Sequence, residues 1–270
     1  MPTPIPITSA QNPHVKHVVK LQQMRECDAR GEFLFEGTHA LIESLAAGWK
    51  VASVYFTSDW IDRNRSLQPG LASIPEQYVV SQDILKKIAT TPSPDGVVAV
   101  GKLPPPMATV PPYRLAIAVD ALQDPGNLGA LQRSAVACGA DEVFVGAGSV
   151  AVHHPKVVRA SAGQWFRRPP KSIGLKRLID ASKQRSIRVF AAVAGGIPAW
   201  DIDLTQPSLI LLGNEGAGLD HRWIEAADAR IGVPMATGVE SLNVAMTGTM
   251  ILYEAMRQRT IATTSAAPSP

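Results

Sequence analysis

Three polar, glycine-rich segments in the second half of the chain hold the residue types best suited to binding a small molecule. They span residues 120–129, 213–220 and 234–243. Glycine has no side chain, so its backbone N–H and C=O groups can approach a ligand closely. Neither a GxGxxG sequence after a first strand nor a GxxxxGK[S/T] sequence is present, which leaves dinucleotide-binding and ATP-binding loops without support. These segments therefore predict close backbone contact with a ligand of another class.

Each of the three segments follows an apolar run that predicts a β-strand. The runs cover residues 115–119, 209–212 and 230–233, and further strands are predicted at 142–145 and 187–193. Helices are predicted at 127–138 and 175–185, with a long terminal helix from about 241 to 259. This alternation is typical of a parallel sheet covered on both faces, whose ligands bind at the carboxyl ends of the strands. One such segment alone would be an ordinary turn, but three in one predicted sheet favour a ligand site.

The order and spacing of residues in these segments define three motifs. They are Asn127-Leu128-Gly129 with Arg133, Gly213-Asn214-Glu215-Gly216-Ala217-Gly218, and Val233-Pro234-Met235 with Glu240-Ser241-Leu242-Asn243. Together they resemble the motifs of the SpoU/TrmH family of RNA ribose methyltransferases, within the SPOUT superfamily. The family commonly has Gly two residues after the Met of the third motif. Here Thr237 takes that place and Gly238 follows, so we expect the turn one residue later.

The resemblance implies a fold, an assembly and a cofactor. The fold would be an α/β domain whose parallel sheet ends in a deep trefoil knot, assembled as a homodimer with active sites at or near the subunit interface. The cofactor would be S-adenosyl-L-methionine, held in the knotted loops mainly by backbone groups, and no metal is expected. By position, the cofactor-binding residues are Gly213, Val233, Leu242 and Met235.

The resemblance also implies that Arg133, Asn127, Glu215 and Asn243 carry the chemistry. Methyl transfer to a ribose 2′-hydroxyl requires an aligned hydroxyl and removal of its proton. Because a guanidinium stays charged at neutral pH, we interpret Arg133 as a cation that positions the hydroxyl, or the adjacent phosphate, and stabilises negative charge. Asn127 would orient Arg133 or the ribose, and Glu215 would hold Arg133 or a substrate hydroxyl.

Each of these side chains also has an ordinary structural alternative. Asn127 and Asn243 could cap the helices that they begin, and Glu215 could cap the helix after its loop. Arg133 could lie on an exposed helix face. We leave these alternatives open at the level of sequence.

The first half of the chain predicts a smaller α/β module. Its strands are expected at 51–57, 78–80 and 96–100, and its helices at 38–45 and 82–89. The segments Ser9-Ala10-Gln11-Asn12-Pro13 and Phe35-Glu36-Gly37 resemble the small substrate-binding domain often fused to this family. We expect an RNA substrate-binding domain at 1–103, a Pro-rich linker at 104–113, the methyltransferase domain at 114–260 and a disordered tail at 261–270.

The net charge of +3 is small and unevenly placed along the sequence. Residues 1–103 carry ten Lys and Arg against ten Asp and Glu, so the excess lies further along the chain. Ten Lys and Arg fall within residues 153–188, where Asp180 is the only acid. This basic stretch indicates either a solvated helix face or an RNA contact. Within it we expect core packing of Trp165-Phe166 and a solvent-facing pair at His153-His154.

Cellular location follows from the cysteines and the apolar runs. Cys27 and Cys138 are isolated, which argues against a disulfide framework or a zinc site and fits a reducing cytosol. The sequence has neither a signal-peptide pattern nor an apolar run of membrane-spanning length. We expect a cytoplasmic protein with no membrane partner.

The predicted function is 2′-O-methylation of RNA. Ribosomal RNA is the expected partner, because the N-terminal module resembles proteins that recognise structured RNA. The alternatives are a transfer-RNA ribose methyltransferase, a nucleobase methyltransferase of the same superfamily, and a non-catalytic RNA-binding or ribosome-assembly factor. Glu240-Ser241-Leu242-Asn243 favours ribose over base. The four residues expected to carry the chemistry weigh against a protein without turnover: Arg133, Asn127, Glu215 and Asn243.

Overall fold

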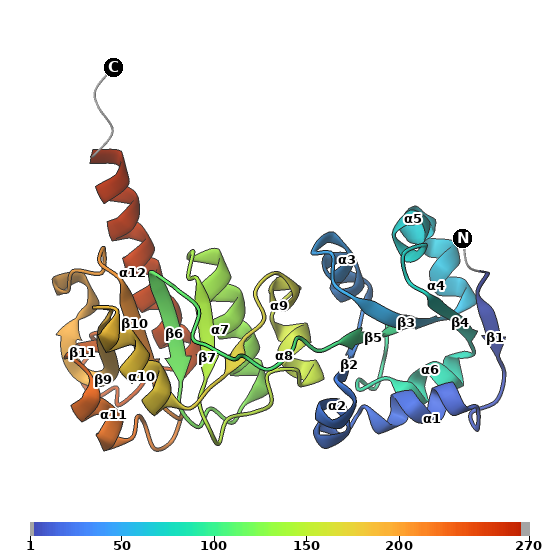
Figure 1. The fold of residues 1–270 in the computed structure, drawn as a ribbon, viewed down its shortest axis with the longest axis horizontal. Helices are drawn as coiled ribbons and strands as arrows, with labels where there is room; N and C mark the ends of the chain where they lie inside the picture. Colours follow the sequence, from blue (N-terminus) through green and yellow to red (C-terminus); the bar gives the residue numbers. More distant parts are fainter. Residues whose placement is uncertain (1–2, 266–270) are drawn as a thin grey trace. The chain divides into compact units, whose positions relative to one another are not determined.

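The computed structural model describes residues 3–265 and divides the chain into two compact units (Figure 1). Unit 1 comprises the residues up to Pro106 together with His153–Arg167. Unit 2 comprises Met107–Val152 together with the residues from Arg168 onward. The expected methyltransferase domain at 114–260 therefore contributes to both units, because fifteen of its residues, 153–167, belong to unit 1.

Unit 1 is built on a five-stranded sheet in the order β1-β4-β3-β5-β2. Strands β1, β4 and β3 run parallel, and β5 is antiparallel to both β3 and β2. The elements are β1 (Ile5–Ile7), α1 (Pro13–Lys20), α2 (Met24–Arg30), β2 (Glu32–Glu36), α3 (Thr38–Ala46), β3 (Val51–Phe56), α4 (Ser58–Arg63), the 3₁₀ turn η1 (Arg65–Leu67), α5 (Gln68–Leu71), β4 (Glu76–Val80), α6 (Gln82–Ile88), β5 (Val97–Lys102), α8 (Pro155–Ala160) and α9 (Gln164–Arg167).

Aromatic packing explains why His153–Arg167 belongs to unit 1. Trp165 and Phe166 are both buried, as expected for core residues. The Trp165 ring lies 4.7 Å from that of Phe33 and 5.0 Å from that of Trp49, centroid to centroid. Phe166 packs against Phe35 at 4.9 Å. Burial of such large rings stabilises by about 1.5–3 kcal/mol each, which holds the segment against β2.

Ion pairs add to this attachment. Arg159 donates to the buried carboxylate of Glu36 at 2.9 Å, and Arg167 donates to Glu43 at 3.1 Å. His153 is also buried, 3.7 Å from the carboxylate of Asp28. The expectation of a solvent-facing pair is therefore wrong for His153.

Unit 2 is built on six parallel strands in the order β11-β9-β10-β6-β7-β8. This confirms the predicted α/β fold with a parallel sheet. The elements are β6 (Leu115–Val119), α7 (Pro125–Ala137), β7 (Glu142–Val145), β8 (Lys171–Ser172), α10 (Leu175–Gln184), β9 (Arg188–Pro198), the 3₁₀ turn η2 (Ala199–Asp201), β10 (Ser208–Leu212), α11 (His221–Ala226), β11 (Ala229–Gly232) and α12 (Val244–Ser265).

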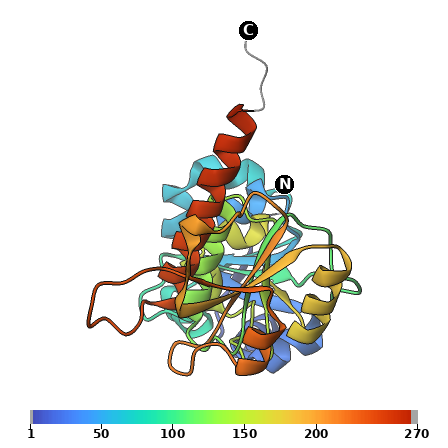
Figure 2. The same cartoon turned by 90° about the vertical axis from the view of Figure 1, so that its left-hand side faces the viewer.

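Alternation along the strands explains how this sheet is covered on two faces. Ala116 and Ala118 of β6 lie in one cluster with Leu178 of α10. Between them, Ile117 faces α7 and α12, where a Cβ added at Gly248 of α12 would lie 3.1 Å from the Ile117 side chain. Figure 2 shows α10 and α12 on opposite sides of the sheet. Small residues thus let α12 approach the strands that carry the glycine-rich loops.

The Pro-rich connector is extended, but its second half is packed. Val110 and Tyr113 are buried in the core of unit 2. The guanidinium of Arg185 donates to the carbonyls of Val110 and Pro111 at 2.8 and 2.9 Å. The expected linker at 104–113 is therefore only partly a spacer, because its apolar side chains bury themselves between prolines.

The terminal helix is longer than the sequence indicated. Helix α12 begins at Val244 and continues to Ser265. The expected disordered tail at 261–270 is corrected for residues 261–265, and the rest of it lies outside the described residues. Ala262 has high helix propensity, and the hydroxyls of Thr263 and Thr264 donate to carbonyls one turn earlier, at 3.1 and 2.9 Å. Between residues 3 and 265, no helix is both long and apolar enough to cross a membrane.

Candidate functional site

A cavity of about 510 Å³ opens in unit 2 where β10 and β11 end, beside the middle of β9. All four residues predicted to bind the cofactor line it, namely Gly213, Val233, Met235 and Leu242. Glu215 lines it as well. Its volume falls in the range of about 300–1,000 Å³ typical of small-molecule sites. The structure therefore places residues far apart in the sequence around one hollow.

The loop after β10 is held in a tight ring. The backbones of Asn214 and Gly218 exchange hydrogen bonds of 2.9 and 3.0 Å. The side-chain oxygen of Asn214 accepts from the N–H of Gly216 at 2.8 Å, and its amide donates to the carbonyl of Ala121 at 2.7 Å. A Cβ at Gly213 would lie 2.1 Å from backbone atoms of Gly218 and Leu219. Only glycine fits at position 213, so the ring fixes one wall of the cavity.

Three of the four residues predicted to carry chemistry form a hydrogen-bonded row. The side-chain amide of Asn127 donates to Glu215 Oε1 at 2.8 Å, and its oxygen accepts from the amide of Asn243 at 3.0 Å. These side chains come from α7, the loop after β10 and the residue before α12. The row therefore joins all three sequence motifs at one edge of the cavity.

The sequence left open whether these side chains cap helices or take part in the site, and the observed helix caps distinguish the two interpretations. Asp124 caps α7 by accepting from the N–H of Asn127 at 2.9 Å, and Asp220 caps α11. The side chains of Asn127 and Glu215 are thus not used as caps. Asn243 serves both purposes, because its oxygen accepts from the N–H of Ala245 at 2.9 Å while its amide reaches Asn127.

Arg133 stands apart from this row. It is exposed on α7 and does not line the cavity. Within residues 3–265 it makes neither a hydrogen bond nor an ion pair. Six residues along a helix correspond to about 240° around its axis, so Arg133 and Asn127 lie on different faces of α7. A single chain does not bring Arg133 to the other three residues.

The third motif is an exposed loop. Figure 2 shows the segment between β11 and α12 standing out from the rest of unit 2. The backbone turns at Gly238, with φ of +87°, and the N–H of Val239 bonds the carbonyl of Ala236 at 3.2 Å. The turn lies one residue after Thr237, as expected from the sequence.

Asp120 connects the first loop to α11. Its carboxylate accepts from the indole N–H of Trp223 at 3.0 Å. Burial raises the pKa of Asp120, and the bond from Trp223 opposes this only in part.

In the part of the chain that the structure describes, no three His, Cys, Asp or Glu side chains are grouped as metal ligands.

Comparison with known proteins decides the family. Residues 114–253, more than half of the chain, match the model of the SpoU rRNA Methylase family. The chain belongs to the SpoU rRNA methylase family. Residues 12–99 match the MRM3-like substrate binding domain. The resemblance drawn from the three motifs and from the N-terminal segments is confirmed.

Several SpoU-family proteins are similar over nearly the whole chain. An uncharacterized tRNA/rRNA methyltransferase, slr1673 of Synechocystis sp., is 37% identical over 96% of each chain. The 23S rRNA (guanosine(2553)-2′-O)-methyltransferase RlmP of Bacillus subtilis is 32% identical over 92% of this chain and 97% of its own. The crystal structure of the SpoU methyltransferase AviRb from Streptomyces viridochromogenes, in complex with AdoMet, superposes with a TM-score of 0.83 at 30% identity, over 93% of this chain and 99% of that one.

Several residues of this SpoU-family site had no sequence prediction. Ala192, Val193 and Ala194 line the cavity from β9, and Ile224 and Thr247 line it from α11 and α12. The first three lie directly before Gly195-Gly196, so a fourth glycine-rich strand segment was a usable signal. Ile224 and Thr247 carry no local signal, because only tertiary packing brings them to the cavity.

Proposed function

We propose that this chain is an S-adenosyl-L-methionine-dependent RNA methyltransferase that methylates a ribose 2′-hydroxyl in ribosomal RNA. The observation that carries the proposal is the row Glu215–Asn127–Asn243 beside the cavity lined by all four predicted cofactor residues. RlmP is named for 2′-O-methylation of 23S rRNA, and AviRb was crystallised with AdoMet. Membership of the same family supports carrying both properties to this chain.

The cavity residues fit S-adenosyl-L-methionine. Val233, Met235 and Leu242 offer apolar surface for the adenine ring, and Glu215 and Glu240 offer negative charge for the cationic groups. Backbone N–H and C=O groups at Gly213 are unhindered by a side chain. When bound, this cofactor supplies an electrophilic methyl group on a sulfonium. We propose that no metal ion takes part.

The chain's own residues then position the ribose. Asn127 is fixed on both sides, by Glu215 and by Asn243, which limits its side chain to one orientation. Among the described residues, only Asn127 is bonded to the Glu215 carboxylate, which leaves Glu215 Oε2 to accept a hydrogen bond from the 2′-hydroxyl. Alignment of this kind is a main source of rate enhancement in displacement reactions.

Arg133 would stabilise the negative charge that develops on the 2′-oxygen. Because it faces away from Asn127 in one chain, we assign it to the cavity of a second copy in a homodimer. The partner surface would be an apolar face of unit 2. Trp200 and Tyr253 are 58% and 59% exposed there, and with Met250 and Val233 they line a hollow of about 380 Å³. Exposed apolar patches of this kind mark protein interfaces.

Sedimentation tests the homodimer. We expect a dimer for the wild type at micromolar concentration and a monomer for the double variant Trp200→Glu/Tyr253→Glu, because two desolvated carboxylates are costly in an apolar interface. Ile42→Glu, on α3 of unit 1, is the control and should leave the dimer intact. A monomeric wild type would contradict the assembly and the assignment of Arg133.

We also propose that the loops after β10 and β11 form the deep trefoil knot. The strand order supports it: β10 lies between β9 and β6, and β11 forms the far edge beside β9. After β11 the chain returns to α12, where Gly248 packs against Ile117 of β6 and Leu131 of α7. A knot forms when a later segment of the chain passes through a loop made by an earlier one. The return from β11 to α12, past the loop after β10, is the segment that we propose passes through.

The function is tested by incubating purified protein with ribosomal and transfer RNA and methyl-labelled S-adenosyl-L-methionine. Mass spectrometry of the digested nucleosides should find label in 2′-O-methylated nucleosides from ribosomal RNA. Label in base-methylated nucleosides would contradict ribose methylation, and label confined to transfer RNA would contradict the substrate. Absence of label from both would favour a non-catalytic RNA-binding protein.

A ribosomal RNA substrate also implies action in the cytoplasm.

A further inference from the structure

The two units divide the charge of the chain unequally. Unit 1, with its segment His153–Arg167, contains thirteen Lys and Arg against ten Asp and Glu, which equals the excess of the whole chain. Unit 2 is neutral by the same count. The positive excess therefore belongs to the unit that contains the matched substrate-binding domain.

The basic stretch at 153–188 is largely engaged within the protein. Its side chains bond carboxylates or backbone carbonyls, in the pairs Arg159–Glu36, Arg167–Glu43, Lys171–Glu142, Lys176–Asp180, Arg177–Ala108 and Arg185–Pro111. Cations used in this way are poor candidates for phosphate contacts, because an RNA phosphate would have to displace a partner. The run of charge seen in the sequence is mainly structural.

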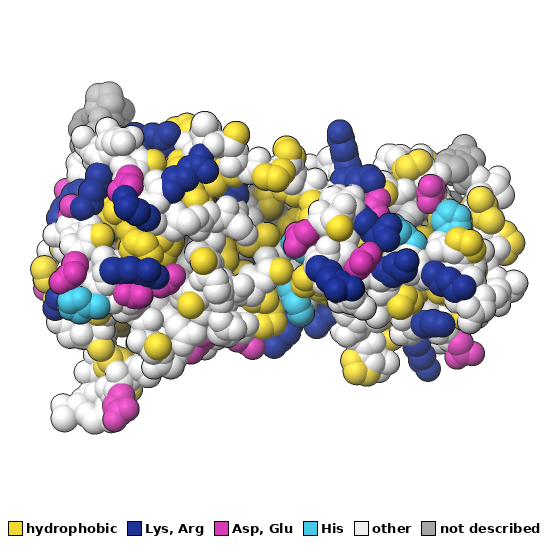
Figure 3. Space-filling view, turned by 60° about the horizontal axis from the view of Figure 1, so that its bottom comes forward, with side chains coloured by type: hydrophobic (Ala, Val, Ile, Leu, Met, Phe, Trp, Pro, Cys, Tyr) yellow, Lys and Arg dark blue, Asp and Glu magenta, His cyan; other side chains and the backbone are white. Residues whose placement is uncertain are grey.

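A different set of cations is free. Lys16 and Lys20 of α1, Arg25 of α2, and Lys86 and Lys87 of α6 are exposed. Within residues 3–265 their side chains make no hydrogen bond or ion pair. We call these five residues the basic surface. Figure 3 shows Lys and Arg side chains gathered on the face of unit 1 that α1, α2 and α6 form, with a few acids among them.

Helices α1 and α6 hold this surface together. Their apolar sides share one core cluster, which includes Val15 and Val18 of α1 and Leu85 of α6. At their ends, the amide of Gln22 donates to the carbonyls of Lys87 and Ala89, both at 3.0 Å. The free cations of the two helices therefore lie on adjoining elements.

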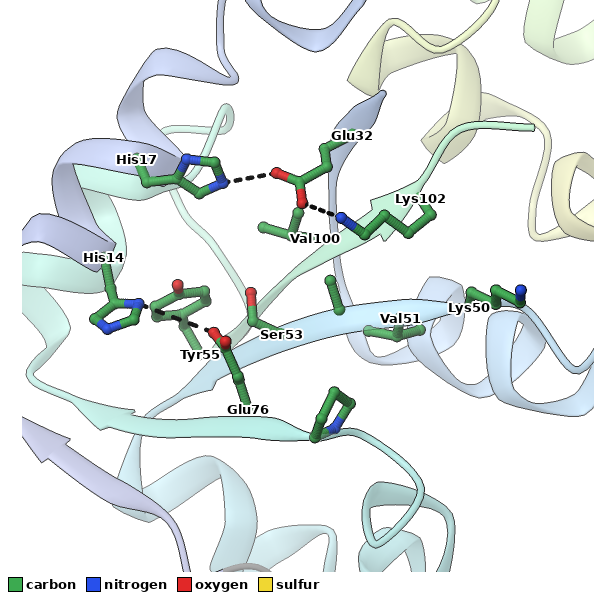
Figure 4. Close-up of a pocket in the computed structure, with 12 residues that line it drawn as sticks. His14, His17, Glu32, Lys50, Val51, Ser53, Tyr55, Glu76, Val100 and Lys102 are labelled. Atoms are coloured by element: carbon green, nitrogen blue, oxygen red, sulfur yellow. Dashed lines mark hydrogen bonds and ion pairs between the residues drawn. The ribbon is translucent and has the colours of Figure 1, made fainter. Parts of the chain in front are cut away.

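Helix α1 contributes residues both to the basic surface and to a nearby pocket. At 100° per residue, Lys16, Lys20, His17 and His14 follow one another around the solvent side of α1. His14 and His17 line a pocket of about 560 Å³ over the sheet, which we call the polar pocket (Figure 4). Its other charged residues are Glu32, Lys50, Glu76 and Lys102.

The polar pocket suits a nucleobase better than a phosphate. Glu32 accepts from Lys102 at 2.6 Å and from His17 at 2.7 Å. Burial raises the pKa of Glu32, but these two bonds outweigh it, so the pKa lies below its usual value and the carboxylate is charged. The carboxylates of Glu32 and Glu76 balance the charges of Lys50 and Lys102, so a phosphate gains little net attraction in this pocket. The carboxylate of Glu76 can accept a hydrogen bond from a base amino group.

The exposed ring of His14 offers a stacking surface next to Glu76. It packs against the buried ring of Tyr78, 4.7 Å away between centroids, and Figure 4 shows it beside Tyr55 and Glu76. Proteins that read RNA commonly stack an unpaired base on such rings and bond its edge. Pocket and cations are thus complementary to different parts of one nucleotide chain.

We propose that unit 1 contacts RNA through these two features, with phosphates along the basic surface and one unpaired nucleobase in the polar pocket. This proposal rests on the proposed RNA substrate, and it adds which surface of unit 1 binds that RNA. The strand crosses α1, whose lysines meet the backbone and whose histidines border the base. Unit 1 therefore recognises an unpaired nucleotide next to its phosphates.

The phosphate contacts are tested on the full-length protein with a mixed-sequence RNA hairpin that has an unpaired loop. The variant combines Lys16→Gln, Lys20→Gln, Lys86→Gln and Lys87→Gln. Each lost phosphate contact removes about 0.7–0.9 from the slope of log affinity against log salt, so we expect a slope shallower by about 3. The matched control removes four exposed cations elsewhere: Arg63→Gln, Arg65→Gln, Lys176→Gln and Lys183→Gln. Circular dichroism and S-adenosyl-L-methionine affinity verify folding of each variant.

An unchanged slope in the first variant, or an equal loss in the control, would overturn the basic surface as the RNA contact. Either result would leave the proposed methyltransferase activity standing, since that activity is measured on the wild type. A wild type that binds no RNA would overturn both proposals.

The base contact is tested with His14→Ala and Glu76→Gln. Loss of a stacked or bonded base should weaken binding of the hairpin by roughly fivefold or more, with the salt slope unchanged. Binding of a blunt duplex without unpaired bases should not change. Asp59→Asn, an exposed carboxylate of α4, is the control. Equal effects on hairpin and duplex, or none on either, would exclude the polar pocket as a base site.

Discussion

Unit 2 and unit 1 differ in how their sites relate to the sequence. In unit 2, most of the cavity lining comes from the loops after β10 and β11, and each of these two loops carries a recognisable motif. In unit 1, exposed cations come from three helices, and no motif marks them. Unit 1 also takes His153–Arg167 from the region matched by the methylase family. Charge counted along the sequence was therefore a poor guide to the RNA-facing surface.

We call His153–Arg167 the borrowed segment, because it lies within the methylase-family match but belongs to unit 1. A substitution in this segment should produce the largest effect. Trp165 is 1% exposed among the aromatic rings of β2 and of the segment after α3. Trp165→Ala should lower the free energy of unfolding of unit 1 by about 3–5 kcal/mol, measured by denaturant titration with circular dichroism. S-adenosyl-L-methionine affinity should stay within twofold.

Ile42→Ala, at a half-exposed position on α3, is the control and should have a small effect. Full stability of Trp165→Ala would show that the segment is not integral to unit 1. The same packing means that a truncation at residue 103 does not isolate the methylase unit, because it leaves Trp165 and Phe166 without their partners.

The second prediction concerns chemistry in unit 2. Arg133→Ala should lower the single-turnover methylation rate by about 10²–10³-fold, the loss typical of removing one group that stabilises an oxyanion. Its cofactor affinity should change little, because the charge that Arg133 stabilises develops only in the transition state. Arg133→Lys keeps the charge and should recover part of the rate. A near-normal rate in the alanine variant would contradict the assignment.

Mixing two impaired chains sharpens the same point, at an S-adenosyl-L-methionine concentration that leaves the Gly213→Ala cavity largely empty. If Arg133 acts on the partner's cavity, heterodimers of Arg133→Ala with the cavity variant Gly213→Ala should regain one working site. Activity that stays at the level of the separate variants would place Arg133 in its own chain's site.

How far the sequence could predict the fold depended on burial. Strands β6 and β7 have the bounds that their apolar runs predicted, because both are covered on two faces. Strands β1 and β2 form the two edges of the sheet in unit 1 and had no prediction. Pro6 within β1 argues against a strand except at such an edge. Strand β1 is largely exposed, so its pattern is weak. Strand β2 is buried, but Trp165 and Phe166, which lie far along the sequence, cover its Phe33 and Phe35.

The site was predictable where a motif encodes backbone geometry. Gly213 and Gly238 are glycines for steric reasons that act within a few residues. The bonds of Asn127 to Glu215 and Asn243 span 88 and 116 residues, and only the family resemblance pointed to them. Arg133 is separated from that row because it lies on a different face of α7 from Asn127. The motif gives the spacing of these two residues but not where the helix begins or which face each one occupies.

The third prediction tests the cavity wall. Gly213→Ala should weaken S-adenosyl-L-methionine binding by about tenfold or more, since a Cβ 2.1 Å from the backbone of Gly218 forces the loop to move. Gly216→Ala is a matched control in the same loop, where the nearest atom to a Cβ would be 3.6 Å away. Calorimetry measures both. Equal losses would show that the loop as a whole, and not position 213, shapes the site.

The smallest expected effect returns to unit 1, at His153. Burial lowers the pKa of His153, and the nearby Asp28 opposes this only in part. A histidine with a lowered folded-state pKa takes up its proton first in the unfolded chain, so its contribution to stability is lost as the pH falls below about 6.5. Acidification from pH 7.5 to 5.5 should therefore lower the Tm of the wild type more than that of His153→Gln, by a few degrees at most, about what 1 kcal/mol produces. His221→Gln, which removes an exposed histidine of unit 2, should keep the wild-type pH dependence. Parallel curves for wild type and His153→Gln would mean that His153 gains no proton on unfolding, and that the borrowed segment is held by its aromatic rings and ion pairs at every pH.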